Sequence, residues 1–267
     1  MGSPGTRPLV VKIGGSTLGA EDTTLNDLAW LSRQTPRPVV LVHGGGPLIS
    51  DWQRRLGLEP RFVRGLRVTD EASLEVAVAV LAGLVNKQLV VGLQALGVRA
   101  VGLAGVDGAL IRARPANPDL GFVGKVERID VGLLGRLLGD GYLPVIAPIG
   151  IWVEAAGDGV RPACLNLNAD TVAGELAAVL AADLIFLTDT PGVLDGAGET
   201  ISGLTPAAAR ALVAEGIARG GMIPKIEACL RAVEAGGTAW VIDGAAPGSL
   251  RRLICGEAVA GTVFRAG

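Results

Sequence analysis

Short runs of β-branched and other apolar residues alternate along this chain with longer stretches of helical character, and the first runs end at glycines. The run PLVVKI (8–13) stops at Gly14-Gly15, and PVVLV (38–42) is followed one residue later by the glycines at 44–46. Strands that alternate with helices usually form a mainly parallel sheet with helices on both faces. We therefore expect an α/β protein, a three-layer αβα sandwich with a mainly parallel central sheet.

The remaining pattern predicts further elements. A helix should begin near Pro47, because the first turn of a helix accepts proline. The stretch 71–96 is apolar around much of its circumference, which predicts a helix buried on more than one side, either in the core or against a second subunit. Turn signals between 99 and 165 predict hairpins that decorate the sheet. Other expected helices are 23–34, 168–181, 206–215, 223–236 and 248–254, and other expected strands are 184–187, 239–242 and 261–264.

Composition narrows the class of protein. The 267 residues suit one large domain, 1–267, or two closely joined lobes. A net charge of −2 argues against a nucleic-acid binder, which usually carries a basic face. The chain shows no uncharged apolar run of membrane-spanning length and no signal peptide, so we expect no membrane partner and a cytoplasmic protein. Cys164, Cys229 and Cys255 are widely spaced in apolar settings, which predicts buried structural thiols.

Lysine is rare in this chain, since only four of its 24 basic residues are lysines. One of them, Lys12, ends the first strand and precedes Gly14-Gly15. Ligands of parallel sheets bind beyond the carboxyl ends of the strands, so this lysine could place its ammonium group beside phosphate oxygens that the glycine backbone also approaches. A purely structural glycine turn is the alternative. The sequence is not a Walker A loop, because GxxxxGK[ST] is absent.

Three glycines, Gly44, Gly45 and Gly46, separate the second strand from the next helix. A glycine loop at a helix N-terminus is a ready anion site. His43 is the only histidine, and a structural role is favoured over that of a general base. The GxSxG and GxGxxG patterns are missing, which disfavours a serine hydrolase and an oxidoreductase on a Rossmann sheet.

Two more polar clusters stand at predicted helix starts. Asn166, Asn168 and Asp170 lie at the start of one helix. Capping of the helix N-terminus easily explains the presence of one such polar side chain, but it explains the presence of three less well. Asn166 and Asp170 would share a helix face if the helix has begun there. Lys225 follows Gly220-Gly221, where a lysine opposes the helix dipole unless an anion or carboxylate lies nearby.

Together these features resemble the amino-acid kinase family, and within it most closely the branch that phosphorylates N-acetyl-L-glutamate. The resemblance covers nearly the whole chain in order. KxGG and LTDxxGV are shared across the family, whereas GLRVTD with NxNAD and GGMIPK is more specific to that branch. The matching segments are VKIGG (11–15), VHGGGP (42–47), GLRVTD (65–70), VNKQLV (85–90), GLAGVDG (102–108), NLNAD (166–170), LTDTPGVL (187–194) and GGMIPKIEA (220–228).

The resemblance implies transfer of the γ-phosphate of ATP to the γ-carboxylate of N-acetyl-L-glutamate, the second step of arginine biosynthesis. That carboxylate is already ionised at neutral pH, so the reaction needs fixed positive charge and positioning and no general base. By resemblance, Lys12 and Lys225 stabilise the transferring phosphoryl group and Asp170 holds both lysines. Mg²⁺ is expected on the ATP phosphates, with no protein ligand assigned.

The resemblance also implies the binding residues. Arg67 should grip the substrate's α-carboxylate and Asn166 should hydrogen-bond the acetylated substrate, with Gly44, Gly45 and Gly46 facing the reacting carboxylate. Residues 1–181 would form a lobe for the amino acid and the dimer contact, and 182–267 a lobe for ATP. The expected nucleotide-binding residues are Gly14, Gly15, Asp189, Gly192, Val193, Leu194 and Gly221.

The chain departs from arginine-inhibited members of the family. Only about seven residues precede the first strand, and GEAVAGTVF (256–264) lacks the acidic and aromatic signature of the arginine site. We expect a homodimer, joined through 71–96 and insensitive to arginine. Two alternatives stay open: a kinase for carrier-protein-linked aminoadipate or glutamate in lysine or arginine biosynthesis, and a non-catalytic nucleotide sensor on the same fold.

Overall fold

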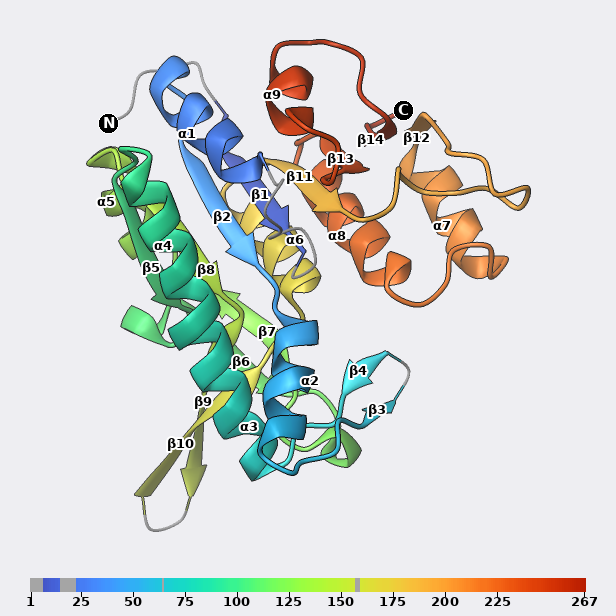
Figure 1. The fold of residues 1–267 in the computed structure, drawn as a ribbon. Coiled ribbons are helices and arrows are strands. Elements are labelled where there is room, and N and C mark those ends of the chain that lie inside the picture. The colour runs from blue at the N-terminus through green and yellow to red at the C-terminus, as the bar shows by residue number, and fades with distance from the viewer. Residues whose placement is uncertain (1–6, 15–22, 64, 157–158) are drawn as a thin grey trace.

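In a computed structural model, which describes residues 7–14, 23–63, 65–156 and 159–267, helices cover both faces of an eight-stranded sheet (Figure 1). The strands are β1 (Leu9–Ile13), β2 (Val39–His43), β3 (Phe62–Val63), β4 (Leu66–Arg67), β5 (Ala100–Ala104), β6 (Ile111–Pro115), β7 (Gly124–Ile129), β8 (Leu143–Ala147), β9 (Ile149–Ala156), β10 (Gly159–Asn166), β11 (Asp183–Thr188), β12 (Gly203–Leu204), β13 (Ala239–Asp243) and β14 (Gly261–Phe264). The helices are α1 (Thr24–Gln34), α2 (Gly46–Arg55), α3 (Glu71–Val78), the π-helix η1 (Ala79–Val85), α4 (Asn86–Ala95), the short 3₁₀ turns η2 (Asp107–Ala109) and η3 (Pro118–Leu120), α5 (Gly132–Gly139), α6 (Ala169–Val179), α7 (Pro206–Ala214), α8 (Met222–Glu234) and α9 (Ser249–Ile254).

The central sheet has the strand order β12-β14-β13-β11-β1-β2-β8-β5. Its neighbouring strands run parallel, except β13 and β14, which pair antiparallel. β1 lies between β11 and β2, and its five residues are all buried. The carboxyl ends of these three parallel strands therefore meet at one edge of the sheet.

Two apolar cores fill the space between the sheet and its helices. Alternate residues of β1 point to opposite faces, so that Val10 packs in one core and Val11 in the other. The core on the Val10 side includes residues of α5, α6 and α8, and the core on the Val11 side includes residues of α1, α3, α4 and α9. This arrangement confirms the three-layer αβα sandwich.

The prediction for 99–165 is wrong in part. β5 and β8 belong to the central sheet. The helix α5 lies between β7 and β8 in the chain. β8 is buried at all five positions, which fits a central strand better than a decorating hairpin. β6, β7, β9 and β10 form the separate four-stranded sheet, of which β9 and β10 extend from the body of the molecule (Figure 1).

The long helix expected over 71–96 is present from Glu71 to Ala95, and its middle segment, η1, is π-helical. By length and composition it could cross a membrane, but 44% of its most apolar window is buried inside the molecule. The core of a soluble protein produces helices of the same kind.

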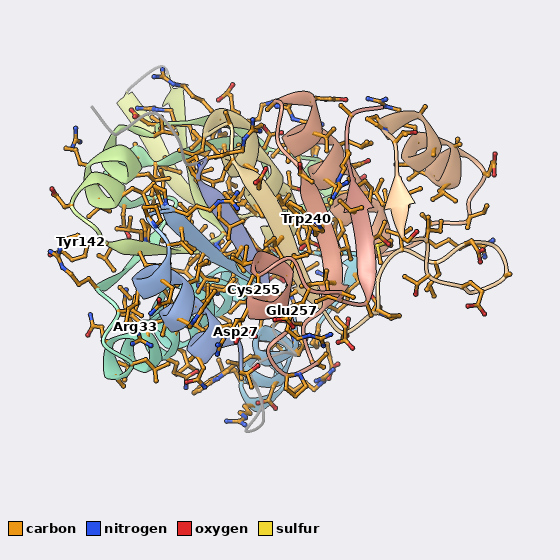
Figure 2. The ribbon with its side chains drawn as sticks, turned by 90° about the horizontal axis from the view of Figure 1, so that it is seen from above. Asp27, Arg33, Tyr142, Trp240, Cys255 and Glu257 are labelled. Carbon is orange, nitrogen blue, oxygen red and sulfur yellow. The ribbon has the colours of Figure 1, made fainter. Side chains whose placement is uncertain are left out.

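The expectation of three buried thiols holds for Cys229 but not for Cys255, which is exposed after the end of α9 (Figure 2). Cys164 is partly buried. The apolar neighbours of Cys255 in sequence face the core, whereas the turn at the helix end carries the thiol outward.

The helices α6 and α8 approach each other closely at a glycine. A Cβ added at Gly174 would lie 2.6 Å from both the Cα and the Cβ of Ala228. That distance is below van der Waals contact, so a larger residue would push the helices apart. We expect Gly174→Ala to lower the free energy of unfolding by about 1–3 kcal/mol, the usual cost of overpacking. Urea denaturation measures this, with Gly135→Ala in α5 as the control, because a Cβ there meets nothing within 4 Å.

Candidate active site

A cavity of about 240 Å³ opens at the carboxyl ends of β1 and β2. It brings together residues that are far apart in the chain. Of the residues expected at the site, its lining contains Lys12, Gly44, Gly45, Gly46, Arg67, Asn166 and Asp170. Apolar side chains complete the wall, including those of Ile49, Phe62, Leu66, Leu81 and Leu167.

Asp170 lies between two lysines. Its Oδ1 is 2.7 Å from Lys12 Nζ and its Oδ2 is 2.9 Å from Lys225 Nζ. The side chains of Asp170 and Lys12 are 8% and 9% exposed. Burial alone would raise the pKa of Asp170, but Lys12 and Lys225 outweigh it and hold this pKa below its ordinary value. The cluster therefore stays ionised, with two positive charges and one negative.

The start of α6 positions this carboxylate. Asn168 caps the helix, and its Oδ1 accepts hydrogen bonds from the backbone N–H groups of Asp170 (2.9 Å) and Thr171 (3.0 Å). Asn168 thus has the ordinary capping role, which leaves Asp170 and Asn166 free for other tasks.

Arg67 is buried at the end of β4. Its guanidinium donates to the Gly46 carbonyl and to Ser50 Oγ, each at 2.8 Å, and to Gln53 Oε1. Burial lowers the pKa of Arg67 below its ordinary value, and the charge of Arg54 adds to the effect. A guanidinium held by three neutral acceptors keeps its full charge available for an anion in the cavity.

Ser50 and Gln53, which hold Arg67, were not among the residues singled out from the sequence. Gly46, Ser50 and Gln53 stand at helical spacing on one face of α2. This spacing of small and polar residues is the signal that could have revealed them.

Asn166 ends β10 and pairs there with Ile149, whereas α6 begins at Ala169. The expectation that Asn166 and Asp170 share a helix face is therefore wrong, although both side chains reach the same cavity. Asn166 Nδ2 donates to Thr69 Oγ1 at 3.3 Å, and Thr69 is fully buried.

The residues expected at the nucleotide lie outside this cavity lining. Gly15 falls outside the described residues. The Gly14 N–H donates to the Leu187 carbonyl at 3.3 Å, and the Gly221 carbonyl accepts from Lys225 Nζ at 3.3 Å. Asp189 is exposed just beyond the end of β11.

Within the loop after Asp189, Val193 is held firmly by its surroundings. Its side chain is fully buried, its N–H donates to Thr262 Oγ1 (2.8 Å), and its carbonyl accepts from Ile201 N–H (2.9 Å). Val193 therefore anchors the loop. Gly192 has φ +153°, and a Cβ there would lie 2.8 Å from Thr262 Oγ1, so the position requires glycine. Leu194 is 38% exposed.

The chain is similar in sequence to known proteins. Residues 7–243 match the model of the amino acid kinase family. An acetylglutamate kinase from Dehalococcoides mccartyi is 42% identical over 262 residues, with 96% of each chain covered. Another acetylglutamate kinase, from a Synechococcus species, is 46% identical over 266 residues, which cover 96% of this chain and 88% of the relative.

Solved structures also align over nearly the whole chain. The structure of N-acetylglutamate synthase from Neisseria gonorrhoeae, complexed with coenzyme A and N-acetyl-glutamate, matches with a TM-score of 0.81 and 28% identity. The match covers 98% of this chain and 60% of the synthase chain. The alignment therefore extends across both the elements that carry Lys12 and those that carry Lys225.

Proposed function

This chain belongs to the amino acid kinase family, and we propose that it transfers the γ-phosphate of ATP to the γ-carboxylate of N-acetyl-L-glutamate, forming N-acetyl-L-glutamyl 5-phosphate in arginine biosynthesis. The observation that carries the proposal is the ion cluster of Lys12, Asp170 and Lys225 at the rim of a cavity that also holds Arg67. The names of the relatives, acetylglutamate kinases at 42% and 46% identity, support the same reaction.

The cluster suits transfer between two anions. The attacking carboxylate and the triphosphate repel each other, and the transferring group spreads negative charge over its oxygens. Lys12 and Lys225 reach Asp170 from β1 and α8, so two ammonium groups flank one carboxylate. Each ammonium keeps N–H groups for the transferring phosphoryl group, and the pairing with Asp170 fixes them before substrate arrives.

The cavity suits a small dicarboxylate with an acyl group. Arg67 offers its fixed charge and its remaining N–H groups, on Nε and Nη1, to the α-carboxylate, and Asn166 offers an amide to the acetylated nitrogen or carbonyl. Phe62, Leu66 and Leu81 supply apolar contacts for the aliphatic carbons. The glycine loop at the start of α2 would face the reacting carboxylate.

ATP would lie beyond the carboxyl end of β11, with its phosphates directed at the lysines. In this proposal residues 182–267 form the lobe for ATP, and residues 1–181 the lobe for the amino acid. Mg²⁺ would travel on the ATP phosphates, where it neutralises charge. Mg²⁺ commonly keeps several waters and binds substrate phosphates rather than a protein cage. Among the described residues, no three histidine, cysteine or acidic side chains are grouped so that they could hold a metal ion.

Trapping of the acyl phosphate as a hydroxamate tests the function directly. Incubation with ATP, Mg²⁺, hydroxylamine and N-acetyl-L-glutamate should give the hydroxamate, and glutamate or aspartate should give far less. Preference for a carrier-protein-linked aminoadipate or glutamate would favour the related carrier-dependent kinase. Nucleotide binding without turnover on either substrate would favour a sensor and contradict the proposal.

Arg67→Lys tests the contact with the α-carboxylate. A lysine retains the charge but loses the planar guanidinium that Gly46, Ser50 and Gln53 hold in place, and hydrogen bonds to charged groups contribute about 1.5–3 kcal/mol. We expect KM for N-acetyl-L-glutamate to rise about 10- to 100-fold, in line with that energy, while KM for ATP stays unchanged. Steady-state kinetics with each substrate varied in turn gives the answer. Arg54→Lys is the control, because Arg54 lies in the same region without lining the cavity. A rise in KM for ATP alone would mean that Arg67 contacts the nucleotide and not the α-carboxylate of the amino acid.

We further propose that the long helix joins two copies in a cytoplasmic homodimer. Trp52, Leu56, Val76, Ala79, Val80 and Leu84 line an apolar hollow of about 510 Å³ between α2 and the long helix. Leu56 is 60% exposed, and Val91, further along the helix, is 66% exposed. These exposed apolar side chains on α2 and the long helix support an interface on this side of the molecule.

Size-exclusion chromatography with light scattering should report a dimer, and Val91→Asp should shift it toward monomer by placing a charge at the contact. Lys125→Asp on β7 is the control for a charge change away from the helix. A hexamer would contradict the proposed assembly, and an unchanged dimer in Val91→Asp would contradict this contact.

A further inference from the structure

His43, the only histidine of the chain, is fully buried at the end of β2, directly before the glycine loop. Adjacent strand residues face opposite sides of a sheet. Since Val42 packs in the core on the α6 side, His43 faces the other layer, where α4 begins. Its Nε2 is 3.2 Å from Asn86 Nδ2, and its Nδ1 is 2.9 Å from the Gly44 carbonyl. The proposed reaction leaves this buried pair without a role.

The neighbours of Asn86 assign the hydrogens in this network. Asn86 Nδ2 lies 2.9 Å from the Val145 carbonyl and 3.4 Å from the Leu103 carbonyl, which can only accept, and Asn86 Oδ1 accepts from Lys87 Nζ at 3.0 Å. The amide group that faces His43 is therefore the NH₂. Since an amide nitrogen only donates, His43 Nε2 accepts and carries no hydrogen. The neutral ring then bears its hydrogen on Nδ1 and donates it to the Gly44 carbonyl.

Burial supports a neutral ring. It lowers the pKa of His43 to about 4; the Gly44 carbonyl pulls in the opposite direction, and the charges of Lys12 and Lys87 lower this pKa further. At neutral pH the ring therefore has one hydrogen.

The Gly44 carbonyl determines where the next N–H points. The peptide bonds among the described residues are all trans, and in a trans peptide the C=O and the following N–H point in opposite directions. With the Gly44 carbonyl turned to the histidine ring, the Gly45 N–H points away from the ring, and Gly45 itself lines the cavity. Within the described part of the chain, this N–H has no hydrogen-bond acceptor.

The π-helix supports the loop from another side. A Cβ added at Gly45 would lie 2.7 Å from Leu81 Cδ2, so η1 packs directly on the glycine backbone. The same π-helix ends where Asn86 begins α4. Interruptions of this kind occur often at functional sites.

We infer that His43, held in its Nδ1–H tautomer by Asn86, is a positioning residue that aims the Gly45 N–H at an oxygen of the reacting carboxylate or the transferring phosphoryl group. The inference rests on the proposed function for the placement of that oxygen. A fixed N–H is effective there because negative charge shifts during transfer, and the donor needs no reorientation.

The tautomer can be measured without any substrate. Because the chain has one histidine, the imidazole signals of ¹⁵N-labelled, untagged protein belong to His43 alone. At pH 7 we expect a protonated Nδ1 and a bare Nε2. A hydrogen on Nε2, or a charged ring, would overturn the inference. This result stands even if N-acetyl-L-glutamate is not the substrate, so that failure of the proposed function is distinguishable from failure of the tautomer.

Two variants test the effect on catalysis. In His43→Asn the amide nitrogen occupies the position of Nδ1, one bond beyond Cγ, and keeps a donor for Gly44, whereas His43→Leu fills the space without a donor. We expect His43→Leu to lower kcat on the order of 100-fold, the cost of a misplaced donor, with KM for ATP unchanged, and His43→Asn to recover most of the loss.

Gln94→Leu is the matched control, because Gln94 also donates from α4 to a carbonyl of β5 (Ala100, 3.1 Å) but lies away from the loop. It should leave kcat unchanged. Equal losses in the two His43 variants would mean that a donor to the Gly44 carbonyl does not restore catalysis, and would overturn the inference. If His43→Leu fails to fold, the tautomer measured in the unaltered protein still tests the inference.

Discussion

Lys12→Ala is expected to lower kcat for N-acetyl-L-glutamate about 100- to 1,000-fold, the usual cost of removing one preorganised donor from a transition state. Lys12 has the most direct position for this task. It is the next-to-last residue of β1, lines the cavity and is 2.7 Å from Asp170, so its ammonium group is fixed before substrate binds. Lys225→Ala should fall in the same range, since Lys225 mirrors this contact from α8. Removing either lysine leaves the transferring group stabilised from one side only.

The hydroxamate assay under saturating substrates measures this loss. Lys125→Ala is the matched control, because Lys125 is exposed on β7 and makes none of the contacts of the cluster. It should keep normal turnover. Near-normal kcat in both Lys12→Ala and Lys225→Ala would remove the basis for phosphoryl transfer at this site. A loss expressed only in KM would indicate that the lysines bind ATP equally in ground state and transition state.

The sequence allowed the elements at this site to be predicted because each has a local signal. β1 is a continuous apolar run that ends in a glycine pair, and α2 begins with a glycine loop and Pro47. Lys12 and Lys225 stood out because lysine is rare in the chain. Their roles came from resemblance to a family, since no local pattern says that residues 55 positions apart, such as Asp170 and Lys225, will meet.

What the sequence did not reveal depends on contacts across layers. Gln53 and Ser50 support Arg67 from another element, and Asn86 reaches His43 from the first residue of α4, directly after the π-helix. The same limit explains why β5 and β8 were taken for hairpins. β8 pairs with β2, which is distant in the chain, and burial of both faces of β8 removes the alternation that marks a strand. β5 pairs in turn with β8. Supporting residues are therefore harder to predict than the residues that contact substrate.

Asp170→Ala is expected to reduce both stability and turnover. The variant leaves Lys12 and Lys225 close together without the carboxylate that separates their charges. Removing one partner of a buried ion pair costs about 3–5 kcal/mol, because the remaining charge is left without compensation. Turnover should fall at least as far as in either lysine variant, since both ammonium groups lose their fixed position. Urea denaturation and the hydroxamate assay measure the two effects.

Glu175→Ala is the matched control. Glu175 also joins α6 to α8, through a 2.8 Å contact with Arg231, but this pair is 26% and 52% exposed. An exposed pair contributes about 0–1 kcal/mol, so Glu175→Ala should change stability little and turnover not at all. Equal effects of the two variants would mean that Asp170 acts as a link between helices and has no special relation to the lysines.

The pH dependence of the free energy of unfolding distinguishes the effect of the charge of Asp170 from the effect of its packing. Lys12 and Lys225 hold the folded-state pKa of Asp170 below its ordinary value of 3.8. A depressed pKa contributes stability that is fully present above the unfolded value and is lost as pH falls through the folded value. The difference in free energy of unfolding between the unaltered protein and Asp170→Asn should therefore be constant near neutral pH and narrow below about pH 4. A difference that does not vary with pH would show that packing, rather than the ionised carboxylate, holds the two lysines in place.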